Sequence, residues 1–270
     1  MDRYAVFGHP IAHSKSPLIH SWFAEQTGQS LSYEAILAPQ DGFAESWAEF
    51  VRTGGRGGNV TVPFKEQAFA LAGQLSARAK QAGAVNTLYI DSAGVLCGDN
   101  TDGLGLVADL QRLAAPLINA SVLVLGAGGA ARGVVGPLLD SGVSKVHIAN
   151  RTASKAEQIA ALFQHHVSAS GYGNIPHEPW HLVINATSSG LSAERPPLDE
   201  AHLAATQLAY DMLYGKEPTA FLAWCAEHQI VCADGLGMLV GQAAEAFAIW
   251  RGVKPQVEPV LKRLRQELGL

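Results

Sequence analysis

A short apolar run followed at once by a glycine-rich turn most constrains how this chain can fold. Residues 122–125 have the pattern of a buried strand and lead directly into GAGGAARG. Within this stretch Gly126, Gly128 and Ala131 fill the G-x-G-x-x-G/A pattern, which allows a tight turn and close approach of the backbone to a pyrophosphate. The first amides of the following helix would face the anion. A glycine-rich turn between a buried strand and a helix predicts a parallel α/β sheet with a dinucleotide-binding site. The alternative is a tight strand-to-helix turn that binds no ligand.

The residues after the next expected strand indicate which dinucleotide this site prefers. An NAD site places an Asp or Glu about 20 residues beyond the first glycine, where the carboxylate bonds the ribose hydroxyls. At that place the chain has Asn150, Arg151 and Thr152, with Lys155 one helical turn later. An arginine can bind a 2′-phosphate in a fork, and the threonine and lysine offer further donors. Each residue alone could be an ordinary exposed side chain, but their joint position favours NADP.

Short β-like runs alternate with helical patterns in two blocks of the chain, and no internal repeat is present. In the first block we expect strands at 4–7, 31–37, 58–62 and 84–90 and helices at 17–26 and 42–53. In the second block we expect strands at 121–125, 145–149, 181–185, 208–212 and 230–232. Such alternation predicts parallel strands joined by right-handed crossovers.

Three further helical patterns define how the blocks are connected. A helix with Leu106 and Leu110 on its apolar face, capped by Thr101 or Asp102, should bridge the two blocks. Two helices follow Gly237, and no strand accompanies them, so we expect them to pack on the first block. The predicted fold is therefore α/β: an N-terminal α/β substrate domain (1–101 plus 238–270) and a Rossmann-like NADP-binding domain (102–237), with a cleft between them.

Composition excludes several classes of protein. The 270 residues are 48% hydrophobic and 16% charged, which is typical of a chain with a large core and not of a disordered one. The formal net charge of −5 has the wrong sign for a surface that neutralises nucleic-acid phosphates. No apolar run is long enough for a membrane helix, and the first residues do not resemble a signal peptide. We expect a soluble, unprocessed protein that binds a small molecule, not nucleic acid or membrane, as a monomer or homodimer.

The cysteines indicate the compartment. Cys97, Cys225 and Cys232 are odd in number, show no C-x-x-C spacing and have no nearby His pair. Neither a disulfide framework nor a structural metal site is expected from them. A reducing cytoplasm fits best.

Small polar residues gather where the strands of the first block are expected to end. They occur as Ser14 and Ser16, as NVTVPFK from Asn59 to Lys65, as Asn86, and as GDNTDG around Asp102. Ligands of open α/β sheets bind beyond the carboxyl ends of the strands, so these stretches could converge on one crevice. Each also has an ordinary interpretation, as a helix cap, a turn residue or a solvated lysine.

Together these stretches resemble the shikimate dehydrogenase family, NADP-dependent enzymes that interconvert shikimate and 3-dehydroshikimate on the route to aromatic amino acids. The matching stretches run in the family's order through nearly the whole chain: GHPIAHSKSPLIH, GGNVTVPFKEQA, AGAVNTL, GDNTDGLGL, GAGGAARG, NRTASKAE, INATSSG, YDMLY and ADGLGMLVGQAAEAF. SKSP, NVTVPFK and DNTDG are not general Rossmann features, so the resemblance is specific.

The resemblance implies a role for individual residues. It makes Lys65 and Asp102 the catalytic pair. It implies that substrate is held by Ser14, Ser16, Asn59, Thr61, Asn86, Tyr214 and Gln242. It implies that NADP is held by Gly126, Ala127, Gly128, Gly129 and Ala130 at the pyrophosphate, by Asn150, Arg151, Thr152 and Lys155 at the 2′-phosphate, and by Thr187, Met212, Gly235 and Met238 beside the nicotinamide.

The residue types agree with this chemistry. A substrate with three hydroxyls needs neutral donors and acceptors, which Ser, Thr, Asn and Gln supply. Oxidation of an alcohol by hydride transfer also releases the hydroxyl proton, which Lys65 and Asp102 could manage. A carboxylate beside Lys65 favours the charged lysine, which is then a poorer base but a good partner for a developing alkoxide, so either residue could accept the proton.

Three other functions stay open at this point. A quinate dehydrogenase or a quinate/shikimate dehydrogenase of mixed specificity would share the same pair. A non-catalytic NADP(H) sensor would be expected to have lost Lys65 or Asp102, and both are present. A methylenetetrahydrofolate dehydrogenase-like enzyme would share the architecture, but the DNTDG stretch argues against it.

Overall fold

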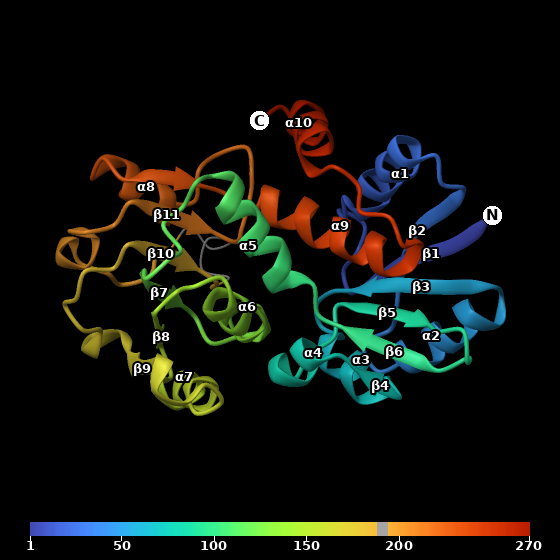
Figure 1. Cartoon of the computed structure of the whole chain (residues 1–270), viewed down its shortest axis with the longest axis horizontal. Coiled ribbons are helices and arrows are strands. Elements are labelled where there is room, and N and C mark those ends of the chain that lie inside the picture. The colour runs from blue at the N-terminus through green and yellow to red at the C-terminus, as the bar shows by residue number, and fades with distance from the viewer. Residues whose placement is uncertain (188–193) are drawn as a thin grey trace. The chain divides into compact units, whose positions relative to one another are not determined.

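The computed structural model describes residues 1–187 and 194–270, and these fall into two compact units. Unit 1 comprises residues 1–105 and 240–266, and unit 2 comprises residues 106–239 and 267–270. Each unit contains its own six-stranded sheet (Figure 1). The chain changes unit inside helices α5 (Asp102–Arg112) and α9 (Leu236–Arg251), a few residues from the expected boundaries. It changes once more near the end of α10 (Val257–Leu268), so residues 267–270 belong to unit 2 and not to the substrate domain in which they were expected. Asp102, expected at the start of the NADP-binding domain, belongs to unit 1, where it contacts Lys65 and Asn86.

The sheet of unit 1 is mixed. Its strands, in spatial order, are β2 (Leu31–Leu37), β1 (Asp2–Gly8), β3 (Gly55–Val60), β5 (Thr87–Ile90), β6 (Leu96–Asp99) and β4 (Gln74–Leu75). Strand β1 pairs in parallel with both β2 and β3, whereas β3, β5 and β6 pair antiparallel. The carboxyl ends of β1 and β3 therefore lie at the same edge of the sheet.

Helices cover both faces of this sheet. They are α1 (Ser16–Thr27), α2 (Phe43–Arg52), α3 (Lys65–Leu71), α4 (Ala77–Ala82), α9 and α10 (Val257–Leu268). Alternate residues of β1 point to opposite faces: Phe7 packs on the aromatic side chains of α2, while Tyr4 stacks on Trp250 of α9 with ring centroids 4.7 Å apart. Helix α10 is joined to α1 by an ion pair between Arg263 and Glu25 at 2.9 Å.

The sheet of unit 2 is entirely parallel. Its spatial order is β12 (Val231–Ala233), β11 (Leu208–Asp211), β10 (Leu182–Asn185), β7 (Ser121–Leu125), β8 (Lys145–Asn150) and β9 (Val167–Gly171). This is the strand order of the doubly wound dinucleotide-binding fold, in which the order reverses between the first and fourth strands. The reversal lies here between β7 and β10, where such folds bind their ligand.

Both faces of this parallel sheet are buried, which explains the continuous apolar runs of its strands. From β7, Val122 and Val124 pack with α5, α6 (Gly129–Asp140) and α7 (Ala153–Ala160). Leu123 and Leu125 face the other side, where α8 (Ala220–Glu227) packs. Three short 3₁₀ helices complete the described part of the unit: η1 (Gln164–His166), η2 (Tyr172–Asn174) and η4 (Glu200–Leu203).

The expected α/β fold with a Rossmann-like second sheet is confirmed. The sequence missed the strands β4, β6 and β9 and the helices α3, α4 and α8. Strand β9 has the sequence VSASG, whose small and polar side chains carry no apolar alternation. It lies at the edge of the sheet, so only one neighbour, β8, specifies its place through backbone hydrogen bonds. Pairing, not hydrophobic pattern, makes this segment a strand.

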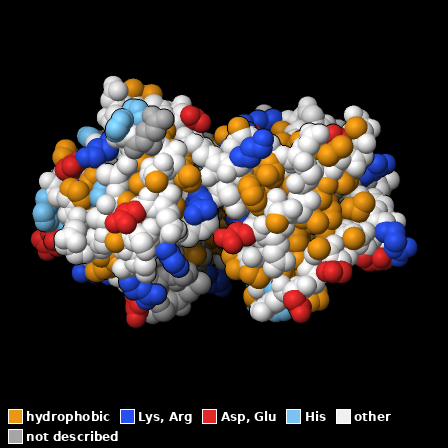
Figure 2. All heavy atoms as spheres, turned by 90° about the horizontal axis from the view of Figure 1, so that it is seen from below, with side chains coloured by type: hydrophobic (Ala, Val, Ile, Leu, Met, Phe, Trp, Pro, Cys, Tyr) orange, Lys and Arg blue, Asp and Glu red, His pale blue; other side chains and the backbone are white. Residues whose placement is uncertain are grey.

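One face of the protein carries charges of both signs. On the face shown in Figure 2, Lys and Arg side chains are interspersed with Asp and Glu. No helix within residues 1–187 and 194–270 is long and apolar enough to cross a membrane.

The close contact at Gly237 predicts a large loss of stability on substitution. A Cβ at Gly237 would lie 2.0 Å from Oδ1 of Asp109, a buried residue. That carboxylate is held by the Tyr210 hydroxyl and Arg112 Nε, both at 2.8 Å, so it cannot swing aside without breaking hydrogen bonds. We expect Gly237→Ala to lower the free energy of unfolding by about 1–3 kcal/mol, the usual cost of overpacking. Urea unfolding measures it.

The matched control for this substitution is Gly173→Ala. A Cβ at Gly173 would have no atom within 4 Å, and its backbone is not in the left-handed region. The control should therefore unfold like the unaltered protein. Equal stability of Gly237→Ala and the control would contradict the packing described for Asp109.

Candidate active site

Lys65 and Asp102 form an ion pair in unit 1. Lys65 is the first residue of α3 and Asp102 the first of α5, and Nζ lies 2.5 Å from Oδ2. The lysine side chain is 22% exposed and the aspartate side chain 9%, so the pair is largely withdrawn from water yet still reachable. The Asp102 backbone N–H donates to Oδ1 of Asn100 at 3.1 Å, which holds the start of α5 in place. The pair can hold a proton or stabilise charge on a hydroxyl group placed beside it.

Asn86 connects this pair to other polar residues. Its Nδ2 donates to Oδ1 of Asp102 at 2.8 Å and to the Thr101 hydroxyl at 3.0 Å, and it lies 3.4 Å from Oε1 of Gln242 on α9. Its Oδ1 accepts the backbone N–H of Thr101 at 2.9 Å. Asn86 and Asp102 are 16 residues apart in sequence, and Asn86 and Gln242 are 156 apart. Tertiary packing of unit 1 brings these predicted site residues together.

Asn59 lies in a second part of the same polar cluster. Its Oδ1 accepts from the Tyr33 hydroxyl at 2.7 Å and from His20 Nε2 at 3.2 Å, while its Nδ2 donates to the Asn86 carbonyl and to the Thr87 hydroxyl, both at 3.2 Å. The amide group is thus oriented from four sides. Tyr33 and His20 were not predicted, since a Tyr in a strand and a His on an apolar helix face look like ordinary core residues.

The remaining predicted residues of unit 1 follow neighbouring strands. Ser14 and Ser16 come after β1, and the Ser14 hydroxyl accepts the backbone N–H of Ser16 at 3.3 Å. Thr61 comes directly after β3 and its backbone N–H donates to the Phe7 carbonyl of β1 at 2.9 Å. Burial raises the pKa of Tyr33 well above its usual value, against hydrogen bonds with Ser16 and Asn59. The two parallel strand ends therefore bring Ser16, Tyr33 and Asn59 into one connected set.

The buried imidazole of His20 makes the protein sensitive to acid. Burial lowers its pKa to about 3, against a hydrogen bond to Asn59 that raises it, and its Nδ1 has no hydrogen-bond partner among the described residues. The unfolded chain therefore takes up a proton below pH 6.5 while the folded protein does not. This contribution to stability is complete above pH 6.5 and is lost as the pH falls. At pH 5 the loss amounts to about 2 kcal/mol from His20 alone.

The measurement compares urea unfolding at pH 7 and pH 5. We expect His20→Gln to show a smaller loss of stability between these pH values than the unaltered protein, whatever its absolute stability. His13→Gln, which changes an exposed histidine, is the control and should keep the full loss. A loss as large in His20→Gln as in the control would contradict the assignment to His20.

The glycine-rich turn lies at the carboxyl end of β7 in unit 2. Gly126 has a φ of 104°, in the left-handed region that glycine tolerates, and Gly128 is the N-cap of α6. A Cβ at Gly128 or Gly129 would meet no atom within 4 Å, so the space beside the turn is open. Ala131 is fully buried among the core residues of the unit. Ala127 and Ala130 flank the turn and are partly buried.

The expected adenosine residues follow β8, the strand beside β7. Asn150 donates from Nδ2 to the Thr152 carbonyl at 2.9 Å, which shapes the turn into α7. Arg151, Thr152 and Lys155 are exposed around the first turn of that helix. The side chains are therefore available to an anionic ligand at the same edge of the sheet as the glycine turn.

A buried polar network supports the ends of β10 and β11. Asn185 Oδ1 accepts from the Thr187 hydroxyl at 2.7 Å, and its Nδ2 donates to Oδ2 of Asp211 at 2.9 Å. The Thr219 hydroxyl donates to the same Asp211 oxygen at 2.6 Å. Burial raises the pKa of Asp211 in spite of these hydrogen bonds, which lower it. A Cβ at Gly126 would lie 3.0 Å from Cγ2 of Thr187, so the turns after β7 and β10 adjoin.

Sequence reasoning assigned no role to Asn185 or Asp211, although INATSSG and YDMLY contain them. The available signal was a polar residue at the end of an otherwise apolar strand. A polar side chain at a fully buried position needs hydrogen-bond partners, so such a residue indicates a specific structural or functional role. The other predicted nicotinamide residues lie nearby: Met212 follows β11 directly, and a Cβ at Gly235 would lie 2.1 Å from the Met212 carbonyl. The backbone N–H of Met238 donates to the Tyr210 hydroxyl at 3.3 Å.

Tyr214 is the one predicted substrate residue outside unit 1. It follows β11 in unit 2, is partly buried, and has its pKa raised by that burial. The hydrogen bonds described above connect Lys65, Asp102, Asn86, Gln242 and Asn59 without it.

Family models match three parts of the chain. Residues 6–88 match the shikimate dehydrogenase substrate binding domain, residues 109–202 match shikimate / quinate 5-dehydrogenase, and residues 235–265 match the shikimate 5′-dehydrogenase C-terminal domain. The first match contains Lys65, Asn59 and Asn86, and the second contains the glycine-rich turn.

Individual proteins match over nearly the full length. The shikimate dehydrogenase (NADP(+)) of Shewanella halifaxensis is 54% identical over 99% of this chain and 96% of its own. An Ael1 enzyme from Pseudomonas putida, solved by crystallography, is 45% identical with a TM-score of 0.94 over 98% of each chain. The crystal structure of the Thermus thermophilus shikimate 5-dehydrogenase in complex with NADP(H) and shikimate is 34% identical with a TM-score of 0.87, over 99% of this chain and all of that one. This chain belongs to the shikimate dehydrogenase family.

Proposed function

We propose that this protein is an NADP-dependent shikimate dehydrogenase, which reversibly reduces 3-dehydroshikimate to shikimate in the route to aromatic amino acids. The observation that carries the proposal is the Lys65–Asp102 pair at 2.5 Å, inside a chain 54% identical to a shikimate dehydrogenase (NADP(+)). The non-catalytic sensor is disfavoured, because this pair is complete and its aspartate is oriented by Asn86.

The Lys65–Asp102 pair would carry the proton of the reaction. As the alcohol is oxidised, its carbon loses a hydride and its hydroxyl loses a proton to this pair. In the reverse direction the pair returns the proton to the oxygen. The fixed 2.8 Å hydrogen bond from Asn86 to Asp102 keeps one carboxylate oxygen in place, so that the other faces Lys65. Preorganised charge of this kind stabilises a developing alkoxide.

The neutral polar residues would bind the substrate. Ser14, Ser16, Asn59, Thr61, Asn86 and Gln242 of unit 1 would supply hydroxyl and amide groups for three hydroxyls and a carboxylate. Tyr214, which belongs to unit 2, stays a predicted substrate residue. Several of these groups are already oriented by protein hydrogen bonds, which lowers the entropy cost of binding. Unit 1 is therefore proposed as the substrate domain.

Unit 2 is proposed as the NADP domain. The open space at Gly128 and Gly129, the left-handed Gly126 and the N-terminus of α6 fit a pyrophosphate. Asn150, Arg151, Thr152 and Lys155 would hold the 2′-phosphate, and no carboxylate in this turn opposes it. Thr187, Met212, Gly235 and Met238 would line the nicotinamide. When bound, the cofactor accepts a hydride in one direction and supplies one in the other.

The decisive assay follows absorbance of the reduced nicotinamide with purified protein. Shikimate plus NADP⁺ should give turnover, and the same substrate with NAD⁺ should give a much lower kcat/KM. Quinate forms a third arm, because one matching family model describes both shikimate and quinate enzymes. Comparable kcat/KM for quinate would establish the mixed-specificity alternative, and no turnover with either acid would refute the proposal.

Further expectations concern the setting of the enzyme. We propose a cytoplasmic location because Cys97, Cys225 and Cys232 are all free thiols, and burial raises the pKa of each, that of Cys225 to about 12. Cys97 and Cys225 are buried and Cys232 is partly buried, and free thiols with raised pKa values are unreactive and suit a reducing compartment. We also propose that the protein binds no nucleic acid, given its net charge of −5 and the mixture of charges on the face shown in Figure 2. A monomer or homodimer is expected, which sedimentation of the purified protein would decide.

A further inference from the structure

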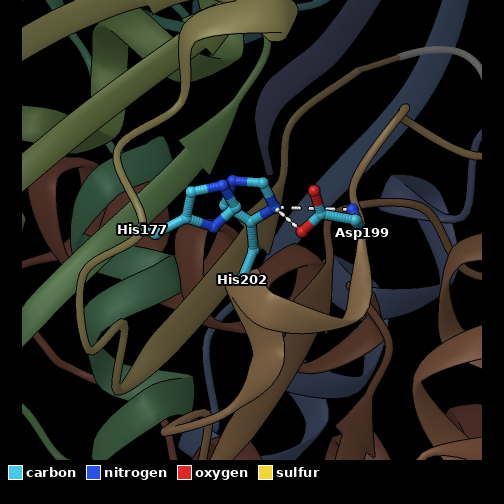
Figure 3. Close-up of side chains that lie close together, drawn as sticks. All are labelled: His177, Asp199 and His202. Carbon is cyan, nitrogen blue, oxygen red and sulfur yellow. Dashed lines mark hydrogen bonds and ion pairs between the residues drawn. The ribbon is translucent and has the colours of Figure 1, made fainter.

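A cluster of metal-binding side chains lies among residues that neither the substrate nor the NADP assignment uses. His177, Asp199 and His202 each offer a ligand atom, and these atoms lie within 4.8 Å of one another. His177 lies between η2 and β10, Asp199 caps η4, and His202 belongs to η4. Figure 3 shows the two imidazole rings face to face, with a nitrogen of His202 directed at the Asp199 carboxylate. Their ring centroids are 4.5 Å apart.

The hydrogen bonds of His202 define which nitrogen could bind a metal. Its side chain is 6% exposed, and Nε2 donates to the Ile175 carbonyl at 3.3 Å. With the proton on Nε2, the lone pair of Nδ1 points toward Asp199. Metal-binding histidines commonly use this arrangement, in which a backbone carbonyl fixes the tautomer and orients the ring.

The contact between His202 and Asp199 places two possible metal ligands side by side. Nδ1 of His202 lies 2.6 Å from Oδ1 of Asp199, and the backbone N–H of Asp199 also points at Nδ1, at 3.4 Å. With Nε2 carrying the ring proton, a nitrogen lone pair and a carboxylate oxygen face each other at hydrogen-bond distance. The two groups are held in this position by a capping box, in which Nδ1 accepts the Asp199 backbone N–H and the Asp199 side chain accepts a backbone N–H of η4. A metal ion bound by both atoms would replace their repulsion by attraction. A metal ion could also bind His177, whereas a proton on Nδ1 of His202 would make no bond to His177.

We propose that His177, Asp199 and His202 form a binding site for a divalent transition-metal ion, of which Zn²⁺ is the representative. Two imidazole nitrogens and one carboxylate oxygen suit zinc and copper, whereas magnesium prefers an all-oxygen site. Water would complete the coordination, because His177 and Asp199 are exposed and the site is open to solvent. Buried His202 anchors the site, and exposed His177 can turn toward it.

The required adjustment is small. Zinc–ligand bonds of about 2.0–2.2 Å place neighbouring ligand atoms of a tetrahedron about 3.3–3.5 Å apart. Nδ1 of His202 and Oδ1 of Asp199, now 2.6 Å apart, must therefore separate by about an ångström, and the ligand atom of His177 must reach the same spacing from both. The exposed side chains of Asp199 and His177 can make these movements. Metal binding would then link the segment before β10 to η4 within unit 2.

The test uses the full-length protein without an affinity tag, since a histidine tag would itself bind zinc. Calorimetric titration with Zn²⁺ should reveal one site per chain, and Mg²⁺ should give no heat of binding. We expect His177→Gln and Asp199→Asn each to weaken zinc binding at least about 10-fold, the effect that loss of even an outer-shell partner has. His165→Gln, which changes an exposed histidine elsewhere in unit 2, is the matched control and should bind zinc normally.

A spectroscopic measurement identifies the ligands directly. Electron paramagnetic resonance of bound Cu²⁺ should show two coordinated nitrogens in the unaltered protein and in His165→Gln, and one in His177→Gln. Because His177 and Asp199 lie on exposed positions, these variants should fold and retain turnover with shikimate. Absence of zinc binding at micromolar concentrations, or binding unchanged in both ligand variants, would overturn the proposal.

Discussion

Replacement of Lys65 by alanine is expected to lower shikimate turnover by a factor of about 10² to 10⁴, the usual effect of removing a positioned acid–base group. The ammonium group lies 2.5 Å from Asp102 and has no neighbouring lysine or arginine on α3 that could replace it. Affinity for NADP should scarcely change, because Lys65 belongs to unit 1 and the glycine-rich turn to unit 2. Steady-state kinetics and cofactor titration of the variant measure the two effects separately.

A double-substitution cycle shows whether Lys65 and Asp102 act as one unit. Asp102→Asn should also lower turnover, because the amide keeps the shape but removes the charge that faces Lys65. Residues that act together are strongly non-additive, so the double variant should be no slower than the slower single variant. Lys80→Ala, at an exposed lysine of α4, is the control and should retain full activity. Near-normal turnover of Lys65→Ala, or additive losses in the double variant, would require a different proton carrier.

Replacement of Arg151 by aspartate is expected to weaken NADP binding and to shift the cofactor preference toward NAD. The exposed guanidinium follows β8, and a charge-assisted bond from it to a 2′-phosphate would be worth about 1.5–3 kcal/mol. Its loss corresponds to a fall of about 10- to 100-fold in kcat/KM for NADP, and the new carboxylate adds repulsion. NAD lacks the 2′-phosphate and can use the carboxylate for its ribose hydroxyls, so its kcat/KM should hold or rise.

The comparison with a charge-matched control makes the cofactor result specific. Lys262→Asp introduces the same change of charge on an exposed residue of α10 in unit 1. That variant should keep the cofactor preference of the unaltered protein. If Arg151→Asp and Lys262→Asp have the same ratio of NADP to NAD efficiency, Arg151 does not contact the 2′-phosphate.

The sequence by itself determined most of the second sheet and the type of site at its edge. Strands buried on both faces are apolar throughout. The sequence alone therefore predicts β7, β8, β10 and β11. The glycine-rich turn can also be predicted from the sequence, because Gly126 has a left-handed backbone conformation that other residues rarely adopt. The backbone conformation at such a position depends mainly on residues adjacent in sequence. It can therefore be predicted from the sequence pattern.

Other features were decided only by the tertiary structure, because they depend on partners remote in sequence. Strand β9 is defined by its pairing with β8. Its small residues form no hydrophobic pattern from which that pairing could be predicted. Burial alone could not distinguish His20 and Tyr33 from core residues, yet both orient Asn59. Likewise His177 and His202 look like unrelated surface histidines until the chain folds and stacks their rings. The type of a side chain restricts the reactions and contacts that it can take part in. Which of these it makes depends on its neighbours, and those neighbours are set by the tertiary structure.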